Sequence, residues 1–229
     1  MDGNGRWAAQ HGLERFEGRI RGVESVRRAI QAATRHGVRY LTLYAFSTEN
    51  WGRPAAEVDA LMELFCKSVI NETPELAAQG VRVRIIGDKS RFPEKVKHHL
   101  DQIENRTATG KRLTLQLALN YSSRSEIVHA MQGLARRAAA GIFSSEEISE
   151  QTVSEALYTA GCPDPDLLIR TSGEQRLSNF LLWQAAYAEL FFTPVLWPDF
   201  TEEDFAQALD EYARRERRFG LVKNNERIR

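Results

Sequence analysis

Cysteine is scarce in this sequence, which carries only Cys66 and Cys162 among 229 residues. Neither belongs to a CxxC pair, so the sequence indicates no cysteine-based zinc site and is typical of a reducing compartment. Long apolar runs are also missing. The longest, residues 180–192, is interrupted by Gln184 and Glu189 and is too short to span a bilayer. No signal peptide is present, and we therefore expect a cytoplasmic protein.

An excess of one charge is absent as well. Lys and Arg together number 31, and so do Asp and Glu. This balance gives no reason to expect a nucleic-acid partner, and any anion site must come from local clustering. With 42% hydrophobic residues and no repeat or linker, the chain is expected to form one domain over residues 1–229. Residues 221–229 are expected to be a disordered tail.

Short strand-like runs alternate with amphipathic helical stretches along the chain. Such alternation predicts an α/β fold with a mostly parallel central sheet flanked by helices. Gly37 is expected to end the first helix, and Pro74 to kink the second. The expected strands are 38–46, 81–86, 113–120, 166–170 and 190–192, and the expected helices are 23–33, 54–80, 93–110, 125–140, 179–188 and a last one from 201.

Polar side chains follow two of these strands directly. Residues 47–53 follow the strand ending at Phe46, and residues 170–178 follow the one ending in DLLIR. In open α/β sheets, ligands bind beyond the carboxyl ends of the strands, so Arg53, Arg170 and Arg176 are expected to converge there. Arginine forks bind oxygen anions, and three of them suit a diphosphate. For any single arginine, the plainer alternative is a surface ion pair with a nearby glutamate.

The chain opens with Asp2-Gly3-Asn4-Gly5-Arg6, which is a second candidate anion site. Glycines let backbone N–H groups face a phosphate, and the Asp2 carboxylate can hold Mg²⁺. On its own this is ordinary turn chemistry. Arg15 and Arg19 follow closely and could complete a cationic rim. Two diphosphate sites with one carboxylate between them suggest transfer between two diphosphate substrates. No P-loop and no Ser-His-Asp set is apparent.

The helix expected from Pro54 carries a wide apolar stripe that includes Val58, Leu61 and Phe65. With apolar residues of neighbouring strands it could wall a tunnel for an apolar substrate. The alternative is ordinary core, and the residues alone favour core.

Several long segments of the sequence resemble the cis-prenyltransferases, and they cover essentially the whole chain. They are MDGNGRWA, SVRRA, LTLYAFSTENWGRP, EVDALMELF, RIIGD, DLLIRTSGEQRLSNFLLWQAAYAEL, LWPDF and RERRFG. The resemblance implies an α/β fold with an apolar tunnel, and it moves the expectation for the apolar stripe from core to tunnel. It also implies Mg²⁺-dependent addition of isopentenyl diphosphate to an allylic diphosphate such as farnesyl diphosphate. The product would be a polyprenyl diphosphate such as undecaprenyl diphosphate, a cell-wall lipid carrier.

The resemblance also implies a role for individual residues. The implied catalytic residues are Asp2 and Asn50, and the implied metal-binding residues are Asp2 and Glu189. The implied allylic diphosphate site comprises Gly3, Asn4, Gly5, Arg6, Trp7, Arg15, Arg19, Ser47, Thr48 and Glu49. The implied isopentenyl diphosphate site comprises Trp51, Arg53, Arg170, Arg176, Leu177 and Ser178. Leu113 matches a bulky residue at the floor of the tunnel.

Departures from the family pattern are few. Arg19 stands where the family usually has histidine, and a strand that relatives carry ahead of the Met-Asp-Gly-Asn motif is expected upstream of Met1. The family implies a homodimer without nucleic acid, and peripheral membrane contact on release of the lipid. Two alternatives stay open: a short-chain cis-prenyl diphosphate synthase and a non-catalytic accessory subunit. The second is disfavoured because Asp2, Asn50 and Arg53 are all present.

Overall fold

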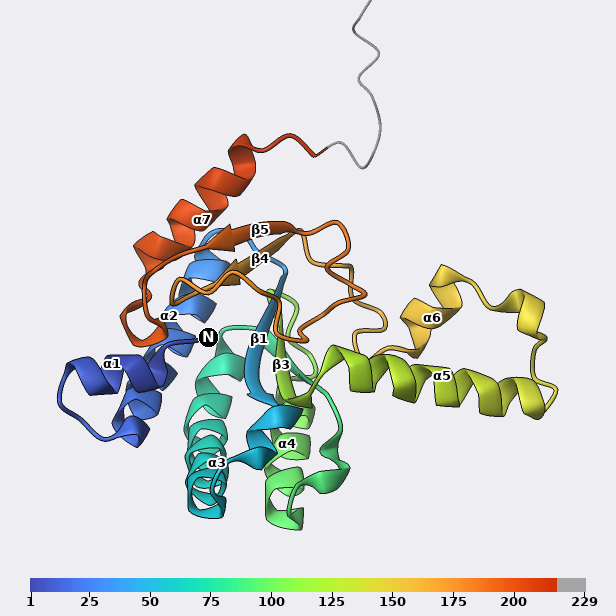
Figure 1. Ribbon diagram of the computed structural model, residues 1–229, viewed down its shortest axis with the longest axis horizontal. Helices are drawn as coiled ribbons and strands as arrows, with labels where there is room; N and C mark the ends of the chain where they lie inside the picture. The colour runs from blue at the N-terminus through green and yellow to red at the C-terminus, as the bar shows by residue number, and fades with distance from the viewer. Residues whose placement is uncertain (218–229) are drawn as a thin grey trace, which may run out of the picture.

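The strands of the computed structural model lie in two sheets, and every strand pair in them is parallel (Figure 1). The structure describes residues 1–217, so the tail expected at 221–229 lies outside the described residues. The larger sheet has the order β1-β3-β2 and the smaller one pairs β4 with β5. The strands are β1 (Tyr40–Ser47), β2 (Val81–Ile86), β3 (Leu113–Tyr121), β4 (Leu167–Arg170) and β5 (Glu189–Phe192). The α/β class with parallel strands is as predicted, although the strands divide between two sheets.

Helices connect and cover these strands, as parallel pairing requires. Helix α3 connects β1 to β2, and α4 connects β2 to β3. The α-helices are α1 (Asn4–Gln10), α2 (Arg15–Arg35), α3 (Ala55–Ala78), α4 (Glu94–Thr107), α5 (Ser123–Ala139), α6 (Glu150–Ala156) and α7 (Glu202–Arg214). The short 3₁₀ helices are η1 (Thr48–Gly52), η2 (Lys89–Arg91), η3 (Ser145–Glu147) and η4 (Trp197–Asp199). Helices α5 and α6 form an arm that extends away from the rest of the molecule (Figure 1).

Two segments differ from their prediction because tertiary contacts outweigh local sequence preference. The opening segment was expected to be a loop, but α1 begins at Asn4, directly after Gly3 with its φ of 103°. The predicted helix over 179–188 is wrong. Asn179 and Leu181 have φ of 61° and 49°, values incompatible with a right-handed helix. Hydrogen bonds to Ser123 replace helical ones, because its N–H donates to the Asn179 carbonyl and its hydroxyl accepts the Leu182 N–H.

Helix α3 contains Pro74 and continues past it to Ala78. No helix among residues 1–217 is both long enough and apolar enough to cross a membrane. Both cysteines are free thiols, with Cys66 buried and Cys162 partly exposed.

The main apolar core lies where the larger sheet meets α2 and the C-terminal segment. It contains Leu43 of β1, Leu113 and Leu115 of β3, and Phe200 and Phe205 near α7. Leu113 is 1% exposed. A second apolar cluster joins α3 and α4 beside Phe46 and Leu119. Together these clusters hold the strand ends in place, which fixes the positions of the loops that follow them.

Candidate active site

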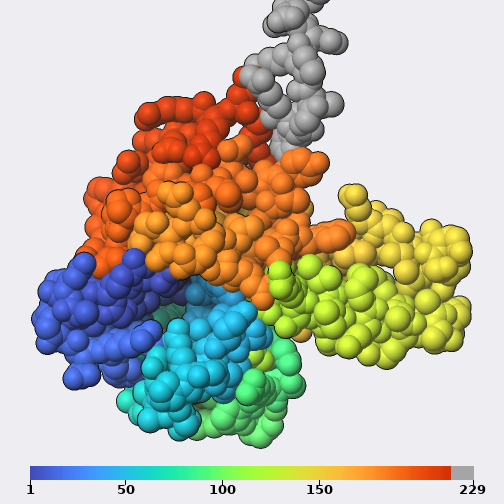
Figure 2. Space-filling model, viewed as in Figure 1, coloured from blue at the N-terminus to red at the C-terminus, as the bar shows by residue number. Residues whose placement is uncertain are grey.

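The dominant cavity of the described residues has a volume of about 1370 Å³ and follows β1 between helices α2 and α3. Figure 2 shows the surface hollowed where the blue N-terminal segment, the cyan segment after β1 and the orange C-terminal segment meet. Near the carboxyl ends of β1 and β4 the lining is polar and rich in arginine. Deeper in, apolar side chains line the cavity, among them Val23, Val26, Ile30, Leu41, Leu43, Leu61, Leu64, Phe65, Val69 and Leu117.

The Asp2 carboxylate lies at the polar end of the cavity and is held by residues far away in sequence. The Thr171 hydroxyl accepts the Asp2 N–H and donates to the Asp2 carbonyl oxygen, both at 2.9 Å. Arg170 Nη2 donates to Asp2 Oδ2 at 3.1 Å, and the Gly3 N–H donates to Oδ1 at 2.8 Å. Partial burial alone would raise the pKa of Asp2, but these hydrogen bonds and the Arg170 charge bring the pKa below its ordinary value. Asp2 is therefore ionised at neutral pH.

Helix α2 supports this N-terminal segment through two glycines one turn apart. A Cβ at Gly18 would lie 2.0 Å from the Asn4 carbonyl oxygen, and a Cβ at Gly22 would lie 2.3 Å from Asn4 Oδ1. A larger residue at Gly18 would displace the backbone of the segment, whereas one at Gly22 would displace the Asn4 side chain. The close approach of α1 to α2 thus depends on the absence of side chains at these positions.

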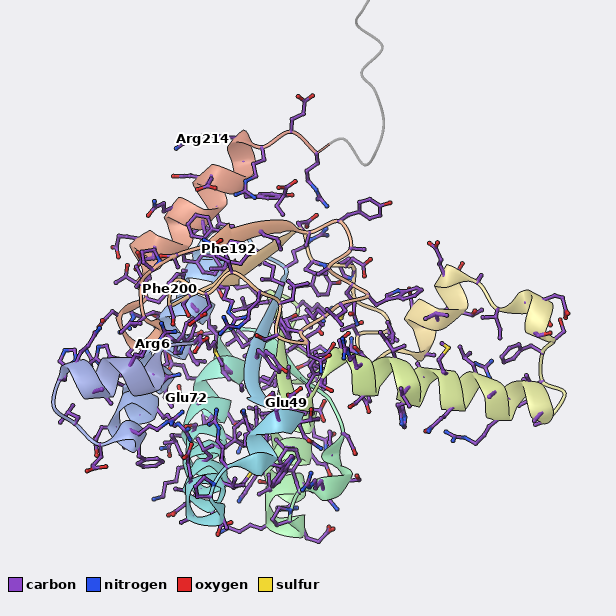
Figure 3. All side chains as sticks on the ribbon, in the orientation of Figure 1. Arg6, Glu49, Glu72, Phe192, Phe200 and Arg214 are labelled. Carbon is purple, nitrogen blue, oxygen red and sulfur yellow. The ribbon has the colours of Figure 1, made fainter. Side chains whose placement is uncertain are left out.

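Arginines from both sides of the cavity share the carboxylate of Glu174. Arg6 Nη2 donates to Glu174 Oε1 at 3.0 Å, and Arg176 donates to the other oxygen. Arg6 Nη1 also donates to the Ser172 carbonyl at 3.0 Å. The N-terminal segment and the loop after β4 are thereby joined above the cavity. In Figure 3, Arg6 lies on the N-terminal segment and Glu49 on the segment after β1.

On the opposite side of the cavity, Glu57 likewise accepts hydrogen bonds from two arginines. The sequence alone did not identify this residue. Its Oε1 accepts hydrogen bonds from Arg19 of α2 and from Arg53 Nη1, the latter at 3.3 Å. Desolvation favours a higher pKa for Glu57, but the hydrogen bond and charge of Arg19, with the charges of Arg15 and Arg53, hold the pKa below its ordinary value. The Arg19 side chain is 10% exposed, and its Nη1 has no partner among the described residues.

Most of the residues predicted for the site line this one cavity. They are Asp2, Gly3, Asn4, Gly5, Arg6, Arg15, Arg19, Ser47, Asn50, Arg53, Arg170, Arg176, Leu177 and Ser178. Arg53, Arg170 and Arg176 therefore converge on a common space, as their positions after two strands suggested. The cavity lining does not include Leu113, which lies in the apolar core.

Five predicted site residues lie outside the cavity lining: Trp7, Thr48, Glu49, Trp51 and Glu189. The Trp7 indole N–H donates to Asp199 at 2.7 Å, and Glu49 accepts a hydrogen bond from Asn179 at 3.1 Å. The Trp51 indole N–H donates to Asn120 Oδ1 at 2.7 Å. These contacts orient the segments that carry the lining residues.

Glu189 lies at the other end of the smaller sheet from Asp2. It is paired with Leu167 at the start of β4, whereas Asp2 contacts Arg170 at its end. Leu167 and Arg170 are three residues apart along β4, so Glu189 and Asp2 are separated by about 10 Å in the direction of the strand. Glu189 instead accepts a hydrogen bond from Arg215 at 3.0 Å. Within residues 1–217, no group of three or more His, Cys, Asp or Glu side chains is arranged to hold a metal ion.

Comparison with known proteins identifies the class to which this fold and site belong. The family model described as putative undecaprenyl diphosphate synthase matches residues 1–220. The chain is 51% identical to an isoprenyl transferase of Agrobacterium fabrum, over 97% of this chain and 90% of that protein. It is also 51% identical to a ditrans,polycis-undecaprenyl-diphosphate synthase of Haemophilus ducreyi, described as (2E,6E)-farnesyl-diphosphate specific, over 96% and 91% of the two chains.

Solved structures share the fold as well, and two of them illustrate the similarity. Lavandulyl diphosphate synthase from Lavandula x intermedia, in complex with dimethylallyl diphosphate, matches with a TM-score of 0.93 and 38% identity, over 96% and 95% of the two chains. A probable undecaprenyl diphosphate synthase from Campylobacter jejuni matches with a TM-score of 0.77 and 34% identity, over 87% and 92%. The chain belongs to the undecaprenyl diphosphate synthase family of prenyltransferases, and it is a transferase of the isoprenyl type.

Proposed function

We propose that this enzyme extends farnesyl diphosphate by repeated Z-condensation with isopentenyl diphosphate. The product is a polyprenyl diphosphate of undecaprenyl size, which serves as a lipid carrier in cell-wall synthesis. One observation carries the proposal: arginines from separate segments surround the polar end of a single cavity whose interior is apolar. The farnesyl specificity in the description of the Haemophilus ducreyi relative supports the choice of starter.

The two diphosphates bind in adjacent parts of the polar end. Arg6, Arg15 and Arg19, with the backbone of residues 3–5 and the Ser47 segment, hold the allylic diphosphate. Arg53, Arg170 and Arg176, with Leu177 and Ser178, hold the diphosphate of isopentenyl diphosphate. Glu57 accepts hydrogen bonds from one arginine of each set, and so does Glu174. These shared carboxylates support a close approach of the two diphosphate sites. Holding both substrates together makes the encounter effectively unimolecular.

Mg²⁺ is the cofactor that this arrangement suits. Mg²⁺ prefers oxygen ligands and is often bound by one or two carboxylates together with substrate phosphates and water. Asp2 fits this pattern because its carboxylate is ionised, lines the cavity and has 41% of its side-chain surface exposed. When bound, the ion would neutralise charge on the diphosphate. Glu189, at the far end of β5, would contribute to a metal environment only through water or from a second subunit.

In the reaction, the carbon–oxygen bond of the allylic diphosphate breaks and diphosphate leaves with the electron pair. Arginine guanidinium groups stabilise the negative charge on the departing diphosphate. The terminal methylene carbon (C4) of isopentenyl diphosphate forms the new carbon–carbon bond, which leaves positive charge at C3, and loss of a proton from C2 gives the Z double bond. Asn50 lines the cavity and assists this proton removal. Its carboxamide oxygen accepts the Ser47 N–H at 3.1 Å, which orients the side chain.

The hydrocarbon occupies the apolar interior between α2, α3 and β1, which thus acts as the tunnel. Each methylene group that leaves water for this interior contributes about 0.8 kcal/mol. Elongation is therefore favourable as long as apolar wall is available to the growing chain.

Product analysis tests this function. The protein is incubated with farnesyl diphosphate, labelled isopentenyl diphosphate and Mg²⁺, and the extracted products are sized. We expect a ladder that ends near eleven isoprene units. Absence of any extended product would contradict the enzyme assignment and favour a non-catalytic accessory subunit.

A short-chain synthase is the second candidate, and the high structural similarity to lavandulyl diphosphate synthase favours it. That enzyme was solved with dimethylallyl diphosphate, a five-carbon allylic substrate. The same assay with dimethylallyl diphosphate as starter separates the two candidates. Products of one or two condensations from the five-carbon starter, with none longer from farnesyl diphosphate, would support the short-chain function.

We also propose a cytoplasmic homodimer that contacts the membrane peripherally to release its lipid product. The arm formed by α5 and α6 supports dimerisation because it carries exposed apolar side chains. Val128 is 55% exposed and Ile142 is 64% exposed. Light scattering coupled to gel filtration measures the mass in solution, and a monomer at micromolar concentration would contradict the dimer. Flotation with lipid vesicles tests the membrane contact.

A further inference from the structure

Helices α2 and α3 border the same cavity and make little direct contact with one another. Helix α2 packs on α1, η4 and α7, and α3 packs on α4. Val23 and Val26 of α2 and Leu61 and Leu64 of α3 all line the cavity. The space between the two helices is therefore cavity, and side chains that interdigitate do not fix their separation.

Two ion pairs join these helices among the described residues, one near each end. Arg19 pairs with Glu57 near the diphosphate sites, and Arg27 pairs with Glu72 farther along both helices. Both members of the second pair line the cavity, whereas only Arg19 of the first pair does so. The second pair, Arg27–Glu72, is called the rear clasp below. Glu72 is labelled on α3 in Figure 3.

The rear clasp has bidentate geometry. Arg27 Nε donates to Glu72 Oε2 at 2.9 Å, and Arg27 Nη2 donates to Glu72 Oε1. Glu72 follows Leu64 and Ser68 at intervals of four residues, so it lies on the cavity-facing side of α3. The Arg27 side chain is 48% exposed and that of Glu72 is 18% exposed. Because both groups reach solvent, water can solvate each charge when the two separate, so the pair is weaker than a fully buried one.

The character of the cavity lining changes at the rear clasp. Before it, the walls are largely apolar, whereas beyond it the polar side chains of Gln31, Glu75 and Gln79 line the cavity together with apolar ones such as Leu76. A hydrocarbon chain that grows from the diphosphate end gains apolar contact until it reaches this level. To extend farther between α2 and α3, it must separate the two charged groups and lie against polar ones, so the gain per added unit falls.

From these contacts we propose that the Arg27–Glu72 ion pair is a specificity-determining clasp that limits the length of the polyprenyl product. This inference rests on the proposed elongation function. The clasp lies away from the reacting groups. It therefore determines the chain length at which elongation stops and leaves the rate of the first condensation unchanged. A weak pair suffices for this role because product length depends on the ratio of extension to release at each step.

The test compares product lengths among variants of the full chain, with farnesyl diphosphate, labelled isopentenyl diphosphate and Mg²⁺. In the apolar double variant Arg27→Met/Glu72→Leu, we expect the amount of product longer than the main wild-type species to rise about two- to fivefold, the range for exposed ion pairs. The exchanged pair Arg27→Glu/Glu72→Arg should return the distribution toward wild type. The rate of the first condensation should stay unchanged in both.

The matched control is the Arg35–Glu202 pair, which also starts from α2 but joins it to α7 and does not line the cavity. Arg35→Met/Glu202→Leu should keep the wild-type distribution. If the Arg27 double variant fails to fold, Glu72→Gln and a salt series on the wild type replace it. Salt should lengthen the wild-type products and leave those of Glu72→Gln unchanged.

The outcomes separate the two proposals. A wild-type protein that makes no extended product overturns the elongation function itself. A wild-type protein that elongates, with identical product distributions in the rear-clasp variants and in the control, overturns the clasp. Longer products in the control variant as well would show a general loosening of α2, which also contradicts a specific role for Arg27 and Glu72.

Discussion

The two ends of the cavity are built in different ways. At the diphosphate end, charged side chains are held by hydrogen bonds between segments far apart in the sequence, such as Arg170 with Asp2 and Arg6 with Glu174. In the interior, apolar residues of α2 and α3 face one another across open space. The first arrangement fixes the positions of individual atoms, and the second fixes only the size of a space. Single substitutions should therefore abolish chemistry at the first end and change product length at the second.

The largest effect is expected for Asp2→Ala at the diphosphate end. It removes the ionised carboxylate that accepts hydrogen bonds from Arg170 and Gly3. Turnover should fall by about three orders of magnitude, which corresponds to ~4 kcal/mol of transition-state stabilisation. Steady-state incorporation of labelled isopentenyl diphosphate measures this change. A rate within threefold of wild type would show that Asp2 has no part in the chemistry.

The second effect concerns how α2 holds the N-terminal segment. In Gly18→Ala, the new Cβ would lie 2.0 Å from the Asn4 carbonyl oxygen, so the segment that carries Asp2 must move. A displacement of about 1 Å from the reacting geometry can cost about a hundredfold in rate, and we expect a loss of that order. Gly133→Ala on α5 is the matched control because nothing lies within 4 Å of its new Cβ. Alanine there should raise stability by up to about 1 kcal/mol. Equal rates in the two variants would refute the close-packing argument.

A smaller effect on rate is expected from an interior substitution. Leu64→Ala on α3 shortens a side chain of the cavity wall, which leaves more room for the hydrocarbon, and touches none of the charged groups at the polar end. The rate of the first condensation should remain within about threefold of wild type, while the product distribution shifts toward longer chains. Chromatography of the dephosphorylated products measures both. A large loss in the rate of the first condensation without a shift in product length would contradict the proposed difference between the two ends of the cavity.

The smallest effect is the pH dependence of stability that Asp2 contributes. Its pKa in the folded protein lies below the ordinary value of 3.8. A carboxylate with a depressed pKa stabilises the fold at pH above its unfolded pKa, and that contribution is lost as pH falls through the folded pKa. The difference in free energy of unfolding between wild type and Asp2→Asn should therefore shrink as pH falls below about 3.8. Urea unfolding at a series of pH values measures it, and a difference that grows on acidification has the wrong sign.

The contrast between the two ends also explains what the sequence reveals. The ends of strands can be predicted from the sequence, because Phe46 and Arg170 are the last residues of β-rich runs and polar residues follow them. The positions of Arg53, Arg170 and Arg176 after strand ends were readable in this way, but their shared cavity also depends on how the two sheets lie, because β1 and β4 belong to different sheets. The α/β class with parallel strands was predictable because helices alternate with strands along the chain.

Other features depend on partners that lie far away along the chain. The turns over 179–188 replaced a predicted helix because Ser123 supplies the hydrogen bonds. Helix α1 forms where glycines on α2 admit it. In the sequence, Glu57 is an acidic residue in the first turn of a helix, which is a common place for one. Its importance emerges only when Arg19 and Arg53 are found on the same oxygen. Periodicity and local motifs carry no information about such pairings.

The central claim is that arginines gathered at one end of the cavity bind diphosphate, and a binding titration tests it most directly. Calorimetry with a non-reactive thio analogue of farnesyl diphosphate compares wild type with Arg6→Ala and Arg15→Ala, two arginines assigned to the allylic diphosphate. Arg35→Ala, whose side chain does not line the cavity, is the control. Each of the first two variants should bind about tenfold or more weakly, because each loses a charge-assisted contact. Unchanged affinity in both, or an equal loss in the control, would contradict the account.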